Sequence, residues 1–166
     1  MDIVSHGLWS VAASKYFRQK TGKKINLWWA FWWGIFPDLF AFAVPFISWT
    51  LHPGTRPDFS IEPPATPDTM LELASRLYNY SHSLIVFGVL FLIIFYVFKT
   101  KAYSMTGWLL HILYDIPTHS YGFFPTPFLW PLADLRLNGY PWAHPWLIIT
   151  NYALLGIVFL LLRKKK

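Results

Sequence analysis

The stretch WWAFWWGIFPDLFAFAVPFISWTL (residues 28–51) decides the class of this protein. Nearly all of its residues are aromatic, aliphatic or small, although Pro37, Asp38 and Pro45 interrupt it. A transmembrane helix needs about 20 predominantly apolar residues, and this stretch is long enough. The sequence therefore predicts a membrane-spanning helix here.

Three further apolar stretches approach the same length, at residues 83–98, 103–119 and 146–162. The composition agrees with them, because 55% of the 166 residues are hydrophobic, 20% are aromatic and only 13% are charged. A typical soluble domain has about 25% charged residues. We therefore expect one all-α domain over residues 1–166, an integral membrane bundle of about four transmembrane helices. A short N-terminal helix that enters the membrane would complete it.

Proline-rich segments separate these stretches. Residues 53–68 combine several prolines with acidic residues, which predicts an exposed loop, followed by a short helix over residues 70–80. Residues 120–145 hold five prolines and many aromatic side chains, which suggests a loop at the level of the lipid headgroups.

Basic residues cluster at residues 15–24, 99–101 and 163–166. If four helices alternate, these clusters fall on one side of the membrane, and the positive-inside rule makes that side cytoplasmic. The C-terminus is then cytoplasmic as well. The net charge of +6 could indicate nucleic-acid binding, but the basic residues flank apolar stretches and form no groove motif, so we expect no nucleic-acid partner.

The motif GWLLHILYD (residues 107–115) places His111 and Asp115 one helical turn apart on the same face. Ionisable residues within a membrane cost roughly 2.5–3.5 kcal/mol each on insertion, which makes them functional candidates. The pair could chelate a metal ion, but a structural hydrogen bond between the two explains the spacing equally well. His119 continues this face, and Pro117 should kink or end the helix, so His119 turns either into the site or toward the membrane interface.

Three more ionisable residues lie near the predicted spans: Asp38 midway through the first, His82 at the start of the second, and His6 in the N-terminal helix. Each also has a simpler explanation. Asp38 could be a buried aspartate held by a hydrogen bond, His82 an interfacial histidine, and His6 a surface histidine. Counting about 1.5 Å of rise per residue, Asp38 and His82 could converge with the His111–Asp115 pair in the outer half of the bilayer. His6 joins them only if its helix enters from outside. The chain has no cysteine, so a metal would need histidine and carboxylate ligands.

The order of four short motifs resembles the LexA-binding, inner-membrane-associated metal-dependent hydrolase family over most of the chain. The motifs are His6-Gly7, Phe36-Pro37-Asp38, Ser81-His82-Ser83-Leu84, and residues 107–115 with the His111–Asp115 pair. That family is similar to the zinc-dependent phospholipase C fold. The resemblance implies an inner-membrane location and metal ligation by His6, Asp38, His82, His111 and Asp115.

The chain departs from the pattern of that family at two positions. Phe40 stands where the family often has a second acid, and Leu77 stands where it often has a histidine. We therefore expect one metal ion rather than two or three.

The first functional hypothesis is a membrane-bound, metal-dependent hydrolase. Neutral imidazoles and carboxylates suit Zn²⁺ or a similar divalent ion, which would activate a water molecule. His82, His111 and Asp115 would hold the metal, Asp38 would ligate it or act as the base, and His119 would protonate the leaving group. A site near headgroup depth favours an amphiphilic, phospholipid-like ester or phosphodiester as substrate, with the bilayer as the partner.

The second hypothesis is a non-catalytic membrane protein, either a metal or proton conduit or a helix bundle that binds a partner. Buried His and Asp residues also serve proton movement. A conduit should carry polar residues through both leaflets, whereas residues 90–98 and 156–162 are almost wholly apolar. This pattern favours a pocket that opens on one side.

Overall fold

The computed structural model describes residues 1–56 and 69–163, and in these residues it is all-α, as the composition predicts. The α-helices of the described residues are α1 (Ile3–Thr21), α2 (Leu27–Leu51), α3 (Thr69–Ser81), α4 (Leu84–Phe98), α5 (Thr106–Thr118) and α6 (Pro145–Leu161). Two short 3-10 helices are η1 (Pro53–Thr55) and η2 (Lys99–Met105). Most of the predicted loop at residues 53–68 lies outside the described residues.

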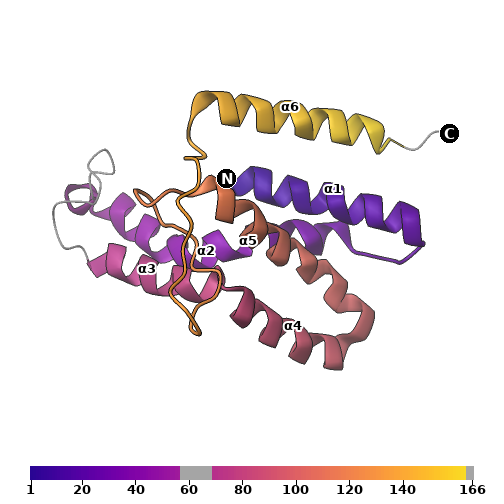
Figure 1. Cartoon of the computed structure of the whole chain (residues 1–166), viewed down its shortest axis with the longest axis horizontal. Helices are drawn as coiled ribbons and strands as arrows, with labels where there is room; N and C mark the ends of the chain where they lie inside the picture. The colour runs from indigo at the N-terminus through magenta and orange to yellow at the C-terminus, as the bar shows by residue number, and fades with distance from the viewer. Residues whose placement is uncertain (57–68, 164–166) are drawn as a thin grey trace.

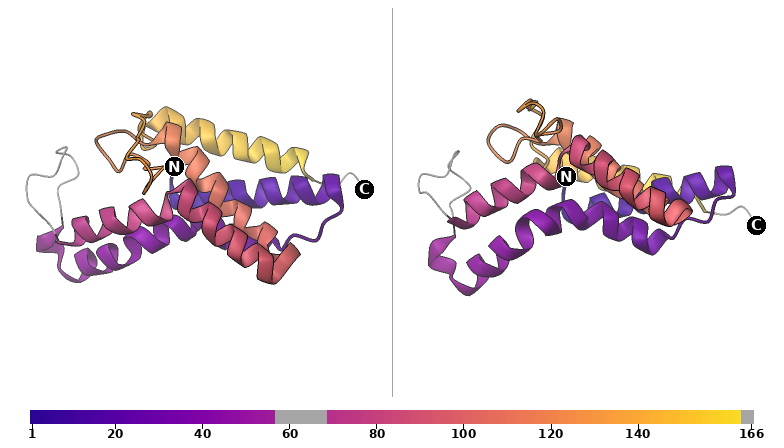
Figure 2. Two further views of the ribbon diagram at one scale, coloured as in Figure 1. Left: turned by 60° about the horizontal axis from the view of Figure 1, so that its bottom comes forward. Right: turned by 90° about the horizontal axis from the view of Figure 1, so that it is seen from below.

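Helix α2 corresponds to the stretch that decides the class of the protein, and it continues through both internal prolines. Each proline removes a backbone donor and crowds the preceding turn, which bends a helix. Figure 2 shows that α2 is bent rather than straight. Its start is well defined, because the side chain of Asn26 accepts hydrogen bonds from the backbone N–H groups of Trp28 and Trp29.

Among the described residues, α2 alone is long and apolar enough to cross a membrane by itself. Helices α3 and α4 pass the same test only together, as a pair bent by 57°. Helix α6 is apolar but has 17 residues. One such helix, or two with the bent pair, is weak support for membrane association, so the four-span bundle stays a prediction.

The third predicted span differs most from the expectation. Its first residues belong to the 3-10 helix η2, so α5 begins only at Thr106. Pro117 lies in the last turn, and α5 ends at Thr118 after 13 residues. At about 1.5 Å per residue such a helix covers roughly 20 Å, less than the hydrocarbon core of a bilayer.

The prediction of a short N-terminal helix was wrong in its length. Helix α1 runs for 19 residues and ends at Thr21, so it includes the first part of the basic cluster, and Gly22 caps it. Gly22 has a φ of 69°, which glycine adopts without strain, and its N–H donates to the carbonyl of Arg18. Helix α1 packs against α2 and α5 and buries Ser5, His6 and Ser10 in that contact.

Two glycines allow α1, α2 and α5 to approach closely. A Cβ atom on Gly34 of α2 would lie 2.8 Å from the backbone oxygen of His6, and one on Gly107 of α5 would lie 2.6 Å from the backbone oxygen of Ala30. No larger residue fits either position without movement of a helix. The contact brings the polar faces of three helices together.

The remaining elements surround this core. Helix α3 lies beside the second half of α2, where Phe42 and Tyr78 belong to one buried apolar cluster. Residues 119–144 form the non-helical connection predicted for 120–145. Helix α6 lies along α1 (Figure 1), held by hydrogen bonds from Trp9 Nε1 to Asn151 (2.7 Å) and from the Tyr152 hydroxyl to Asp2 (2.9 Å).

Asp2 connects the start of α1 to α6. Burial disfavours its charged form, but hydrogen bonds from the Ser5 N–H and the Tyr152 hydroxyl outweigh this effect and hold the Asp2 pKa below its usual value. Asp2 is therefore an ionised acceptor at neutral pH.

Candidate metal centre

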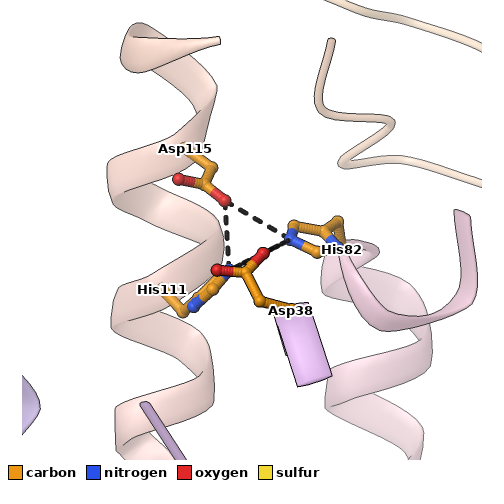
Figure 3. Close-up of side chains that lie close together, drawn as sticks. All are labelled: Asp38, His82, His111 and Asp115. Carbon is orange, nitrogen blue, oxygen red and sulfur yellow. Dashed lines mark hydrogen bonds and ion pairs between the residues drawn. The ribbon is translucent and has the colours of Figure 1, made fainter. Parts of the chain in front are cut away.

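Four buried side chains converge where α2 and α5 meet the junction of α3 and α4: Asp38, His82, His111 and Asp115 (Figure 3). One ligand atom from each lies within 4.8 Å of the other three, so the group could hold a metal ion. We call these four residues the metal quartet. They come from three parts of the chain that only the fold brings together.

His111 and Asp115 occupy successive turns of α5, as their spacing predicts. His111 Nε2 lies 3.1 Å from Asp115 Oδ2. The other ring nitrogen, Nδ1, lies 2.7 Å from the carbonyl oxygen of Gly34. A carbonyl can only accept, so Nδ1 donates, and in the neutral imidazole the lone pair is on Nε2, which faces the quartet.

His82 lies in the two-residue break between α3 and α4, where a helix end aims its side chain inward. Its Nδ1 lies 2.9 Å from the Ser81 hydroxyl, and its ring stacks on Tyr78 at 3.6 Å between centroids. Its Nε2 is 3.0 Å from His111 Nε2 and 3.3 Å from Asp115 Oδ2. The next residue, Ser83, begins α4 by accepting the N–H groups of Ile85 and Val86.

Asp38 completes the quartet from α2, with Oδ1 at 3.6 Å from the Nε2 atoms of both His82 and His111. Asp115 Oδ2 is buried and has no hydrogen-bond partner. A buried carboxylate oxygen that faces imidazole lone pairs is unfavourable unless a cation lies between them. A tetrahedral zinc site with bonds of about 2.0–2.2 Å places its ligand atoms roughly 3.3 Å apart, close to the separations found here. The donor set therefore fits a divalent cation.

The second oxygen of Asp115 faces away from the quartet. Oδ1 lies 2.7 Å from the Met1 amine, 2.9 Å from His6 Nε2 and 3.4 Å from His119 Nε2. The His6 ring also stacks on the His111 ring at 3.7 Å. The short distance from His6 to Asp115 lacks hydrogen-bond geometry, and neither ring nitrogen of His6 has a hydrogen-bond partner. His6 thus lies beside the quartet but outside it, and its role as a ligand stays a prediction.

His119 turns inward, which is one of the two alternatives that Pro117 leaves open. It caps the end of α5 in an extended conformation and is almost fully buried. Its Nδ1 lies 2.9 Å from the carbonyl oxygen of Phe124 and 3.3 Å from the Tyr78 hydroxyl. These contacts direct Nε2 toward Asp115, at the edge of the quartet.

An open pocket of about 290 Å³ reaches the quartet from the surface. Asp2, Asp38 and His119 are its polar side chains, and Phe42, Phe46 and Trp142 form apolar walls. A second pocket of about 270 Å³ shares the His119 and Trp142 walls. The polar groups at the end of a mostly apolar pocket suit a ligand with one polar and one apolar part.

The sequence interpretation missed two residues that position the quartet. Gly34 orients His111 through its carbonyl, and Tyr78 supports the ring of His82 and contacts His119. Each lies four residues before a predicted site residue, Gly34 before Asp38 and Tyr78 before His82. Residues four apart share a helix face, and this spacing is the signal that could have found them.

Comparisons with known proteins add no relative, because no protein family, curated protein or solved structure matches this chain. The geometry of the metal quartet and its pocket therefore carries the functional inference.

Proposed function

We propose that this protein is a membrane-bound, metal-dependent hydrolase that holds one divalent ion, Zn²⁺ in the first place, in the metal quartet. The observation that carries the proposal is the set of four buried ligand atoms, two from imidazoles and two from carboxylates. The two imidazole Nε2 atoms lie 3.0 Å apart, and each lies 3.1–3.6 Å from the carboxylate oxygens. Nitrogen and oxygen donors at this spacing suit Zn²⁺ better than Ca²⁺ or Mg²⁺, which prefer more oxygen ligands.

A bound zinc ion would lower the pKa of a water molecule to about 7 and so supply a nucleophile at neutral pH. Groups of the protein itself would orient the ligands and move protons. The Gly34 carbonyl and the Ser81 hydroxyl hold His111 and His82 with Nε2 toward the quartet. Asp38 is both a quartet member and a pocket wall, so it ligates the ion or accepts a proton. His119 at the pocket edge, next to Asp115, donates a proton to the leaving group.

The pocket supports an amphiphilic ester or phosphodiester, similar to a phospholipid, as the substrate. Phe42, Phe46 and Trp142 would pack against its apolar part, while its polar bond would reach Asp38 and His119. A substrate of this kind comes from the bilayer, in agreement with the apolar composition of the chain. The proposal includes a location in the inner membrane with several spans and a cytoplasmic C-terminus.

The metal is tested first, by elemental analysis of the protein purified in detergent. We expect about one equivalent of zinc or a similar metal in the wild type and background levels in His111→Ala and Asp115→Ala. His144→Ala is the matched control, because His144 is an exposed histidine outside the site. Background metal in the wild type would refute the metal centre.

Hydrolysis is a separate test. A panel of phospholipids and phosphodiesters is incubated with metal-free and metal-loaded protein, and we expect turnover only with the loaded protein. His119→Gln should lower turnover and leave the metal content unchanged. A loaded protein without turnover on any of these substrates would count against the hydrolase and leave the metal centre intact.

A non-catalytic role is the second candidate, and the full burial of His82, His111 and Asp115 favours it, because structural metal sites are closed. Proteoliposomes distinguish a conduit from a hydrolase. Transport of metal ions or protons that His111→Ala abolishes would support a conduit.

The chain has no cysteine, so single-cysteine variants with an impermeant reagent report on which side of the membrane each loop lies, without background labelling.

A further inference from the structure

The end of the molecule remote from the metal quartet is basic. In Figure 1 the C-terminal ends of α1, α4 and α6 lie at this end, together with the start of α2. Its described basic residues are Arg18, Lys20, Lys23, Lys24, Lys99 and Arg163. The described acidic residues lie elsewhere, in the metal quartet, at the starts of α1 and α3 and in the connection before α6. The positive charge here is therefore not balanced by a described carboxylate.

A cleft of about 580 Å³ opens at this basic end, between the start of α2, the end of α4 and η2. Its apolar walls are Trp29, Trp33, Ile94, Phe98, Ala102 and Met105. Its polar rim is Lys24, Asn26 and Ser104. We call it the basic cleft. It is larger than the pocket that reaches the metal quartet.

Lys24 is the cation that the basic cleft offers to a ligand. It is exposed, and no hydrogen bond or ion pair holds its side chain within the described part of the chain. Its neighbour Lys23 differs, because its Nζ donates to the Tyr103 hydroxyl at 3.3 Å and lies 4.5 Å from the centre of that ring. The Asn26 side chain is occupied by the cap of α2. Among the residues that the structure describes, Lys24 alone combines an available charge with a place on the rim.

A free cation beside exposed aromatic walls is complementary to an amphiphile with an anionic headgroup. Trp29 and Phe98 are 56% and 55% exposed, so an apolar chain could cover them while a phosphate contacts Lys24. A small soluble phosphate could contact the polar rim but would leave the aromatic walls exposed. Basic pockets beside membrane helices bind anionic lipid headgroups in this way, with about 1 kcal/mol from each basic residue.

We propose that the basic cleft binds an anionic phospholipid, with its phosphate at Lys24 and an acyl chain along Trp29 and Phe98. The site is independent of the proposed hydrolase. It uses no residue of the metal quartet, and the start of α2 lies about three helical turns from Asp38.

The test is a lipid titration of the detergent-purified protein, followed by native mass spectrometry. Phosphatidylglycerol is compared with phosphatidylcholine of the same acyl chains, and glycerol phosphate is added as the headgroup without chains. We expect phosphatidylglycerol to bind about fivefold more tightly than phosphatidylcholine, and glycerol phosphate not to compete. Lys24→Gln should remove the fivefold preference.

Lys20→Gln is the matched control, because Lys20 is an exposed lysine at the same end that does not line the basic cleft. It should keep the preference. Equal affinity of the wild type for both lipids would overturn the proposal, and so would an equal loss in Lys20→Gln and Lys24→Gln, which would indicate diffuse attraction to a basic surface. Competition by glycerol phosphate would overturn the assignment to a lipid. Circular dichroism and size-exclusion elution of both variants report whether they are folded.

Discussion

The metal quartet and the basic cleft both place charged groups among aromatic side chains, but they do so in opposite ways. In the quartet the imidazoles and carboxylates are buried, and the Gly34 carbonyl and the Ser81 hydroxyl fix the two histidine rings. At the basic cleft Lys24 is exposed and held by nothing in the described chain. The difference shows where the fold has to fix the positions of side chains. A buried charge is costly without a partner, whereas an exposed charge is stabilised by water.

The largest effect is expected in the quartet. Asp115→Ala removes the carboxylate that contacts both quartet histidines, and we expect metal affinity to fall more than about 100-fold, since loss of an outer partner alone costs about 10–100-fold. Competition with a fluorescent chelator measures the affinity. Asp134→Ala, at an exposed aspartate that pairs with Arg136 outside the quartet, is the control. Equal affinities in the two variants would contradict the role of Asp115.

The second prediction concerns the close contact of helices that supports the quartet. Gly34→Ala puts a Cβ atom 2.8 Å from the backbone oxygen of His6, so we expect the free energy of unfolding in detergent to fall by about 1–3 kcal/mol. The metal affinity should fall with it, because the Gly34 carbonyl orients His111.

Gly88→Ala is the control for that substitution, because a Cβ atom on Gly88, which lies in α4, meets nothing within 4 Å. It should stabilise the helix by roughly 0.5–1 kcal/mol or leave it unchanged. If both alanines had the same effect, close packing at Gly34 would not be the cause.

The third prediction concerns Tyr78 and separates the stability of the fold from the metal affinity of the quartet. Tyr78→Phe removes the hydroxyl that contacts His119 and Thr126, each at 3.3 Å, and should lower the free energy of unfolding by about 0.5–1.5 kcal/mol. The ring that stacks on His82 remains, so the metal affinity should not change. Tyr80→Phe, at an exposed tyrosine of the same helix, should leave both quantities unchanged. A loss of metal in Tyr78→Phe would extend the site to His119.

The smallest effect is expected at the basic end. Lys23→Gln removes an exposed contact with Tyr103, and the free energy of unfolding should change by less than about 0.5 kcal/mol. Metal content should stay at the wild-type level. A destabilisation of the size expected for Gly34→Ala would remove the contrast between the two regions.

Particular residues show how far the sequence leads. Apolar length predicts the positions of α2, α4 and α6 to within a few residues, and the prolines predict the non-helical connection before α6. Helical spacing alone places His111 and Asp115 on one face. The 3-10 helix η2 and the extension of α1 to Thr21 were not predictable in the same way, because local composition does not favour one kind of helix strongly over another.

By itself, the sequence determined that this chain is an all-α protein with an unusually apolar composition and a few ionisable residues in apolar helices. Only the tertiary structure decided that Asp38, His82, His111 and Asp115 share one centre, that His6 stacks against it and that His119 turns inward. The physical reason is that spacing specifies the neighbours of a residue within one helix. Contacts between helices depend on how closely backbones approach, and here Gly34 and Gly107 set that approach.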